Sequence, residues 1–233
     1  MLSFIYPRVC QVCRAETAVP RRGWIGPQCR RQVRPVMPPW CDRCGRPISG
    51  EATVPFECAY CAEVQPHFRF ARAAVFVEGV VLQVIHEYKY RQALWFEPFL
   101  ARLLIRAAQP SIREGGWDVV VPVPLHPVRE RERGFNQASR LGQRLAQHTG
   151  LPMEQDWLER VRYTPTQTLL SRSERLRNVR GAFRARRGAP VQGRRIVLVD
   201  DVLTTGATTS ACAHALRESG AEDVCVWTVA RGL

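Results

Sequence analysis

Two adjacent carboxylates followed by hydroxyls and glycine stand out in residues 197–208, VLVDDVLTTGAT. In order, these residues are Asp200, Asp201, Thr204, Thr205, Gly206, Ala207 and Thr208. Carboxylates accept hydrogen bonds from sugar hydroxyls or hold the waters of Mg²⁺. Hydroxyls, a closely approaching glycine backbone and a helix N-terminus suit phosphate. The stretch therefore predicts a ribose-phosphate site. The alternative, a strand-to-helix turn with one capping side chain, explains one of these residues and not the series.

The elements around this stretch alternate between strand-like and helix-like patterns. Apolar runs predict strands over 72–79, 117–124, 194–200 and 223–229. Helical spacing covers 80–91, 93–109, 136–150 and 205–220. The alternation predicts an α/β fold with a parallel sheet, in which ligands bind at the carboxyl ends of strands. No repeat with a period of about 20–50 residues is apparent.

The series VLVDDVLTTGATT resembles the phosphoribosyl pyrophosphate (PRPP) signature of type I phosphoribosyltransferases. Three further segments, DVVVPVPLHPVRERERGFNQA (118–138), PTQTLLSRSERLRNVRGAF (165–183) and EYKYR (87–91), follow a cysteine-rich N-terminus. Together they resemble the ComF family of competence and GntX-like proteins over nearly the whole chain. The resemblance implies a type I phosphoribosyltransferase fold, in which the paired acids bind the ribose hydroxyls and the loop from Thr204 to Thr208 wraps the 5′-phosphate.

The same resemblance implies two domains. A cysteine-rich double zinc-ribbon module is expected over residues 1–66 and a phosphoribosyltransferase-like domain over residues 67–233. Residues 62–71 form the expected junction, where the cysteine- and proline-rich composition of the N-terminal zone gives way to strand and helix patterns.

Other candidate residues for the PRPP site lie in separate segments. Related transferases hold the pyrophosphate with a loop that corresponds here to VPVPLHP (121–127), so Leu125, His126 and Arg129 are candidates. Arg133 and Asn136 lie in a segment typical of the family and are candidates for substrate or diphosphate contact. His126 can equally be a solvated loop histidine.

Lys89 is the single lysine of the chain. A compact ammonium is a suitable point charge for a diphosphate leaving group. It can equally complement the carbonyl end of the helix-like stretch that it follows.

Residues 171–187, SRSERLRNVRGAFRARR, hold seven arginines and one acid. This composition fits a mobile lid that closes over PRPP, a patch that follows nucleic-acid phosphates, or a solvated loop. The candidate lid or nucleic-acid residues are Gln167, Ser171, Arg175, Arg177, Asn178 and Arg180.

Seven of the nine cysteines precede residue 62. Two Cys-x2-Cys pairs separated by 13 residues match the spacing of a four-thiolate Zn²⁺ site. These residues are Cys41, Cys44, Cys58 and Cys61.

A weaker group comprises Cys10, Cys13 and Cys29, because Gly26 stands where the resembled family has a fourth cysteine. This group binds zinc with an outside ligand or binds none. Cys212 and Cys225 fall on apolar faces and are expected in the core.

The formal net charge of +13 favours polyanionic partners, such as nucleic acid or phosphorylated small molecules. Charge alone can equally serve solubility. No secretory signal is visible, and no apolar stretch approaches the ~18–20 residues that span a bilayer. We therefore expect a soluble, cytoplasmic protein without a transmembrane segment.

Two functions from different classes remain open. The first is a magnesium-dependent phosphoribosyltransferase, in which pyrophosphate leaves and an unidentified nucleophile attacks the anomeric carbon through an oxocarbenium-like transition state. Its expected catalytic residues are Asp200, Asp201, Lys89 and Arg133. The second, implied by the resemblance, is a non-catalytic protein that handles single-stranded DNA during DNA uptake beside a helicase, with PRPP as ligand or regulator. The expected cofactors are Mg²⁺ and Zn²⁺.

Overall fold

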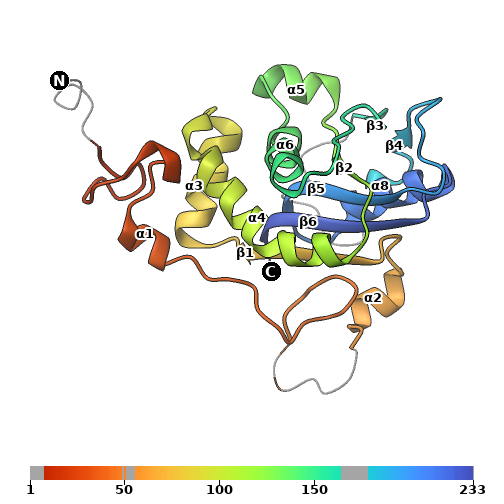
Figure 1. Cartoon of the computed structure of the whole chain (residues 1–233), viewed down its shortest axis with the longest axis horizontal. Helices are drawn as coiled ribbons and strands as arrows, with labels where there is room; N and C mark the ends of the chain where they lie inside the picture. The colour runs from red at the N-terminus through yellow and green to blue at the C-terminus, as the bar shows by residue number, and fades with distance from the viewer. Residues whose placement is uncertain (1–7, 49, 51–55, 164–177, 233) are drawn as a thin grey trace.

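The centre of the fold is a parallel sheet of four strands in the order β1-β6-β5-β2 (Figure 1). The computed structural model describes residues 8–48, 50, 56–163 and 178–232. The strands are β1 (Phe70–Phe76), β2 (Val119–Pro122), β5 (Arg195–Leu203) and β6 (Asp223–Arg231). The α/β fold with a parallel sheet is confirmed, and the carboxyl ends of all four strands meet at one edge.

Helices cover both faces of this sheet (Figure 1). One face carries α3 (Gly79–Tyr90), the turn η3 (Leu94–Phe96), α4 (Glu97–Glu114) and α6 (Gln137–Thr149). The other face carries α8 (Ala207–Glu218). Strands buried on both faces read as continuous apolar runs, which is why they were visible in the sequence. Among the helices of the described residues, none has the length and hydropathy of a bilayer-spanning segment.

Several predicted boundaries were wrong, among them the ends of β1, α4 and β5. Helix α4 continues to Glu114, beyond the predicted end at residue 109, with Pro110 inside it. Pro110 is exposed, so the helical carbonyl that loses its N–H partner there can bond to water. Strand β5 continues to Leu203 because β6 stays paired with it through Val202–Ala230 and Leu203–Arg231. Both aspartates therefore lie within the strand, whereas the predicted strand ended at Asp200.

Three short elements were not predicted. Strands β3 (Leu158–Arg160) and β4 (Phe183–Ala185) form an antiparallel pair beside α8, and α5 (Pro127–Arg133) follows the loop after β2. Strands of three residues are too short to show a periodic pattern. Buried Trp157 attaches this pair to the α8 face of the core.

The described part of the N-terminal segment contains the short helices η2 (Pro20–Arg22), α1 (Pro27–Arg31) and α2 (Ala59–Val64), and it runs along one side and below the sheet (Figure 1). Its first half packs on α4, where Arg102 Nη2 donates to Arg21 O at 2.7 Å. Its second half packs on β1, where Ala71 N donates to Arg43 O at 2.7 Å. The domain limits at 1–66 and 67–233 stay a prediction.

The two halves of this segment repeat one local structure. Arg14 and Gly45 each follow a Cys-x2-Cys pair, with φ of 58° and 68°. Each donates its N–H to the carbonyl of the first cysteine of its pair, at 2.9 and 2.8 Å. Each half then forms a short helix, with Gly26 as N-cap of α1 and Cys58 as N-cap of α2. The sequence showed no repeat, because the two halves share their backbone conformation but very few residue types.

Candidate functional site

A pocket lies at the carboxyl end of β5, where the strand leads into α8. Its lining residues are Asp200, Val202, Leu203, Thr204, Thr205, Gly206, Ala207, Thr208 and Thr209. Gly206 has φ 78° as N-cap of α8, a conformation that favours glycine. In the first turn of α8, Ser210 N donates to Gly206 O at 2.8 Å and Ala207 N donates to Thr205 Oγ1 at 3.3 Å. The pocket therefore joins the predicted carboxylate and hydroxyl residues to a helix N-terminus with its partial positive charge.

Asp201 is the buried member of the aspartate pair, 3% exposed. Its carboxylate forms an ion pair with Lys89 Nζ, from the last turn of α3. Burial acts to raise the pKa of Asp201, but the charges of Lys89 and of the more distant Arg133 outweigh it and lower that pKa. The structure thus brings Lys89 to the aspartate pair, and Arg133 acts on Asp201 through its charge.

Asp200 is half-buried and lines the pocket. Its Oδ1 accepts the N–H of Asp201 at 2.8 Å. Burial and the neighbouring Asp201 charge raise the pKa of Asp200 to about 8. At neutral pH the ligand-free carboxyl therefore mostly holds its proton, and the pocket carries less negative charge than two aspartates suggest.

Arg160 of β3 is a cation near Asp200 that sequence reasoning missed. Burial lowers the pKa of Arg160, and the charge of Asp200 acts in the opposite direction. Because β3 is only three residues long and was not predicted, no sequence pattern placed Arg160 near Asp200.

Arg133, at the end of α5, is fixed by neighbours on two other helices. Its Nη1 donates to Gln137 Oε1 at 2.5 Å. Its guanidinium lies 5.5 Å from the ring centre of Tyr90, a half-exposed residue one position after Lys89. Arg133 thus sits beside the end of α3, close to the Lys89–Asp201 pair.

The loop after β2 is held by helix caps. Asn136, the buried N-cap of α6, accepts the N–H of Ala138 at 2.9 Å and donates Nδ2 to Val123 O at 3.1 Å. His126 caps α5 by accepting the N–H of Val128 at 3.3 Å. Asn136 was predicted as a PRPP contact, but the structure uses its amide to position the loop that carries Leu125 and His126.

Arg129, another predicted contact, lies in the first turn of α5. Its Nη1 pairs with Glu132 Oε2 at 2.9 Å, and its guanidinium lies 5.3 Å from the ring centre of Tyr163. The ring of Tyr163 also contacts the ring of His126. Arg129 and His126 therefore both contact Tyr163, the last described residue before 164–177.

Most of the predicted lid lies outside the described residues. This holds for Gln167, Ser171, Arg175 and Arg177. Asn178 and Arg180 are described, and their backbone carbonyls accept hydrogen bonds from Arg162 Nη2 at 2.7 and 2.8 Å. The lid or nucleic-acid role stays a prediction for all six residues.

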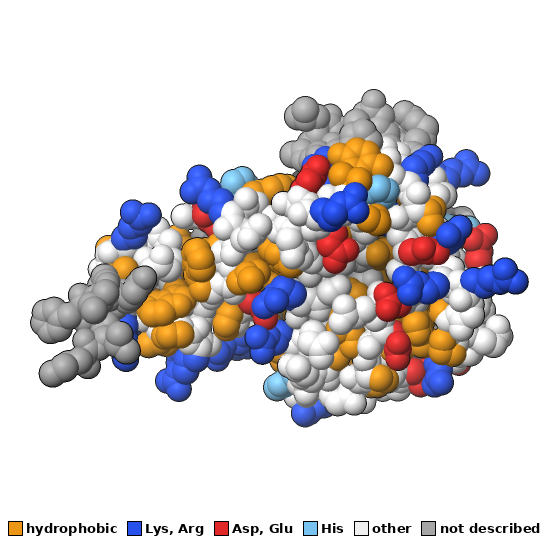
Figure 2. All heavy atoms as spheres, turned by 90° about the horizontal axis from the view of Figure 1, so that it is seen from above, with side chains coloured by type: hydrophobic (Ala, Val, Ile, Leu, Met, Phe, Trp, Pro, Cys, Tyr) orange, Lys and Arg blue, Asp and Glu red, His pale blue; other side chains and the backbone are white. Residues whose placement is uncertain are grey.

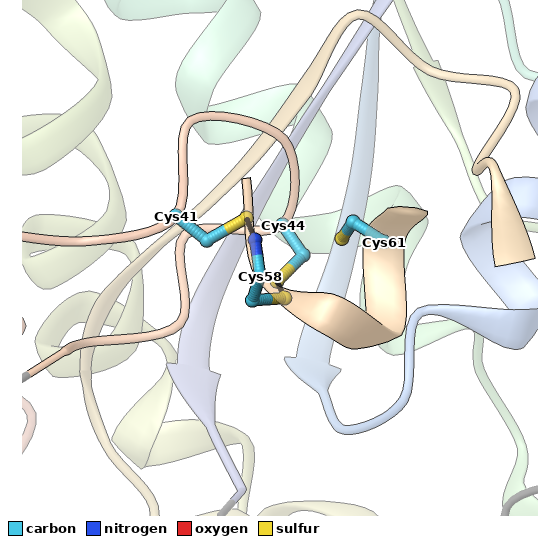
Figure 3. Close-up of side chains that lie close together, drawn as sticks. All are labelled: Cys41, Cys44, Cys58 and Cys61. Carbon is cyan, nitrogen blue, oxygen red and sulfur yellow. Dashed lines mark hydrogen bonds between the residues drawn. The ribbon is translucent and has the colours of Figure 1, made fainter. Parts of the chain in front are cut away.

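The four cysteines predicted to bind zinc converge in the second half of the N-terminal segment (Figure 3). All four are buried, and their sulfurs lie within 4.8 Å of one another. The Sγ atoms of Cys44 and Cys58 are 3.8 Å apart, and Cys58 N donates to Cys41 Sγ at 3.3 Å. Tetrahedral zinc with Zn–S bonds of about 2.3 Å places sulfurs about 3.8 Å apart. The cluster fits a structural Zn²⁺ site.

A buried arginine ties this cluster to the sheet. Arg231, the last residue of β6, is 3% exposed and donates to Cys44 O at 2.6 Å. Its Nη2 lies 3.7 Å from Cys44 Sγ. A cation beside a thiolate favours the charged, metal-binding form. Sequence reasoning missed Arg231 because one more arginine among so many carries no signal.

The weaker cysteine group also converges, and an acid joins it. Cys10, Cys13, Cys29 and Glu16 place one ligand atom each within 4.8 Å of the others. Glu16 was missed, although the sequence holds a signal for it: Glu16 is the only acidic residue among the first 41. Cys212 and Cys225, by contrast, are fully buried in the two faces of the core, as predicted.

A fourth missed feature is the buried carboxylate of Glu97, at the start of α4. Glu97 is 3% exposed and pairs with Arg140 and with Arg144, whose Nε lies 2.7 Å from Glu97 Oε1. Both arginines come from α6. This ion cluster locks α4 to α6 on the face of the sheet that also carries Lys89.

Comparison with known proteins matches each of the two parts of the chain to a family model. Residues 1–65 match the model of the double zinc ribbon domain, and residues 98–232 match that of the phosphoribosyl transferase domain. Competence protein F of Haemophilus influenzae is 31% identical over 99% of this chain and 100% of its own length. The chain belongs to the competence protein F (ComF) family.

Other ComF relatives carry related names. The DNA utilization protein YhgH of Salmonella typhi is 36% identical over 97% of this chain and 98% of its own length. The competence protein ComFC of Bacillus subtilis is 28% identical over 82% of this chain and 77% of its own length. The phosphoribosyltransferase fold and the cysteine clusters of the zinc-ribbon region are thereby confirmed for this ComF member.

Basic side chains are spread over the face shown in Figure 2, with acidic ones among them. The charge of +13 therefore does not gather into a single patch on that face of the ComF chain. Trp40 of the N-terminal segment is half-buried, with the guanidinium of Arg72 5.1 Å from its ring centre.

Proposed function

We propose that this ComF-family protein binds PRPP together with Mg²⁺ at the carboxyl end of β5. The observation that carries the proposal is the pocket in which Asp200 and the N-terminus of α8 lie side by side. The phosphoribosyl transferase model over residues 98–232 supports it. Asp200 and Asp201 bind the ribose hydroxyls, and residues 204–208 with the first turn of α8 bind the 5′-phosphate.

The residues that surround the pocket fit a magnesium-diphosphate ligand. Asp200 offers carboxyl oxygens of the kind that Mg²⁺ or its waters bind. When bound, Mg²⁺ neutralises charge on the diphosphate. Lys89 and Arg133 lie next to the aspartates and add positive charge on the opposite side of β5 from α8.

We infer further that the bound ligand reacts by phosphoribosyl transfer. The bond between the anomeric carbon and the pyrophosphate oxygen breaks, and an acceptor nucleophile forms the new bond. The protein's part is orientation of the two reactants and stabilisation of charge. Asp201, kept ionised by Lys89, lies where a carboxylate would stabilise positive charge on the ribose.

Calorimetric titration of PRPP with Mg²⁺ tests the binding step. We expect saturable binding to the wild type and none to the variant Asp200→Asn/Asp201→Asn. A charge-matched control, Asp156→Asn/Glu114→Gln, removes two exposed acids that do not line the pocket and is expected to bind like the wild type. A folded wild-type protein that does not bind PRPP would overturn the proposal.

A second function, handling of single-stranded DNA, is favoured by the names of the relatives. They include competence proteins and DNA utilization proteins. The net charge of +13 and the arginine-rich residues 171–187 support it. In this function PRPP is a ligand or regulator and a DNA-uptake helicase is a candidate partner. Pyrophosphate release with an acceptor distinguishes the enzyme, and salt-dependent oligonucleotide binding distinguishes the DNA-handling protein.

A further inference from the structure

The repeated halves of the N-terminal segment show where a metal ligand is missing. In the second half, Cys58 occupies the N-cap of α2 and supplies one of four thiols. In the first half, Gly26 occupies the N-cap of α1 and supplies no side chain. The first site therefore has three thiols where the second has four.

Glu16 fills the place that the absent side chain leaves. Its Oε1 lies 3.7 Å from Cys13 Sγ and accepts the N–H of Cys29 at 3.0 Å. Its Oε2 accepts the N–H of Gln28 at 2.8 Å. These two hydrogen bonds aim the carboxylate at the start of α1, the position that a cysteine holds in the other half.

Glu16 and a side chain at position 26 exclude each other. A Cβ atom built on Gly26 would lie 2.1 Å from Glu16 Cδ and 2.4 Å from its Oε1. Because Gly26 has an ordinary extended φ of −74°, no backbone strain requires glycine there. The glycine instead provides the space that the carboxylate occupies.

The donor set suits Zn²⁺ in charge and in distance. A carboxylate carries the same single negative charge as a thiolate, so three thiolates with one carboxylate match the total charge of four thiolates. Bonds of about 2.3 Å to sulfur and 2.0–2.2 Å to oxygen place tetrahedral ligands about 3.5–3.8 Å apart. The 3.7 Å between Glu16 Oε1 and Cys13 Sγ lies in this range.

We propose that Glu16 completes a second Zn²⁺ site with Cys10, Cys13 and Cys29, in place of the thiolate that position 26 lacks. The carboxylate has two tasks, since it ligates the metal and caps the first amides of α1. Cys13 is exposed and Glu16 half-buried, so this site is more open to solvent than the four-thiolate site.

Metal content and the spectrum of cadmium in the full-length protein test the proposal. The wild type should bind two zinc ions, and its ¹¹³Cd-substituted form should give two resonances, one typical of four sulfurs and one of three sulfurs with oxygen. Glu16→Gln keeps the size and the capping oxygen but lowers the affinity of the first site at least about 100-fold, more than an outer-shell residue contributes. Glu63→Gln, an exposed acid close to Cys61, is the matched control and should leave both sites unchanged.

A compensating variant makes the result independent of any loss of folding. Glu16→Ala/Gly26→Cys removes the carboxylate and restores the thiolate, so we expect two zinc ions and two four-sulfur cadmium resonances. Two outcomes overturn the proposal. One is a wild type with a single zinc and with Cys10, Cys13 and Cys29 open to alkylation. The other is Glu16→Gln with both zinc ions held at wild-type affinity, which would leave Glu16 only as the cap of α1.

Discussion

The ammonium of Lys89 forms an ion pair with the buried carboxylate of Asp201, and this joins the end of α3 to the middle of the site strand β5. Only 18% of the Lys89 side chain and 4% of the Asp201 side chain is exposed. A buried charge without its partner is strongly unfavourable. The single lysine of the chain therefore has a structural task in the site before any ligand binds.

Lys89→Met should destabilise the protein, because it leaves the Asp201 carboxylate buried without a cation. We expect the free energy of unfolding in urea to fall by about 3 kcal/mol. Lys89→Met/Asp201→Asn should recover at least half of that loss. Arg91→Met, which breaks an exposed pair with Glu87 at the same helix end, should change stability by less than about 1 kcal/mol. Equal losses in both single variants would contradict the buried pair.

Binding of PRPP should strengthen as the pH rises through the pKa of Asp200. This pKa is raised to about 8, so the carboxyl is mostly protonated at pH 7, and binding as a carboxylate must release the proton. From pH 7 to 8 the association constant should rise about fivefold and then level off above pH 9. The window lies above the phosphate pKa of about 6, so ligand titration contributes little.

Calorimetry in two buffers of different ionisation enthalpy measures this effect directly. Near pH 7 the wild type should release nearly one proton for each PRPP bound. A constant affinity between pH 7 and 9, with no proton release, would show that Asp200 does not bind the ligand as a carboxylate.

The two metal sites should lose zinc at different rates. The four-thiolate site is buried and has Arg231 beside Cys44, whereas Cys13 of the first site is exposed. A chromogenic chelator should therefore remove one zinc ion in a fast phase and the other at least about tenfold more slowly. Cys44→Ser should abolish the slow phase and Cys13→Ser the fast one. Loss of both ions in one phase would contradict the difference in burial.

Neutralising arginines of the stretch 171–187 should weaken binding of single-stranded oligonucleotides. Each phosphate contact contributes about 0.7 to the slope of log affinity against log salt concentration. Arg175→Gln/Arg177→Gln/Arg180→Gln should therefore reduce the slope by about 2. The matched control, Arg106→Gln/Arg131→Gln/Arg194→Gln, removes three exposed arginines outside that stretch. An equal loss of slope in both variants would assign the effect to net charge alone.

The sequence revealed the parts of the fold that obey a local rule. The sheet strands are buried on both faces and show as apolar runs, and α6 ends at Gly150 in the left-handed conformation, as its glycine indicated. Helix α4 extends beyond its predicted end because Pro110 lies at an exposed position, where a helix tolerates proline. The pair β3–β4 was not predicted, because each strand has only three residues and the pair packs on α8, which is distant in the sequence.

The candidate site was predictable to the extent that its residues are consecutive. Asp200 and residues 204–208 line one pocket because one strand and one turn carry them. Arg160 and Glu16 reach their sites through tertiary contacts that no spacing encodes. Asn136 has a side chain of the kind that contacts ligands, yet its amide forms hydrogen bonds with the backbone of Val123 and Ala138. Residue type alone cannot separate these two uses.

The place of β6 between β1 and β5 has a consequence for how the chain is made. Strand β1 leaves the ribosome early, whereas the strand that pairs with it is synthesised after almost all the rest of the described chain. Until then the apolar sequence FARAAVF of β1 presents an open strand edge in the nascent chain. Non-local pairing of this kind slows folding and prolongs exposure to aggregation. Synthesis of β6 therefore allows β1 to pair with the rest of the sheet. It also supplies Arg231, which donates to Cys44 O beside the four-thiolate cluster.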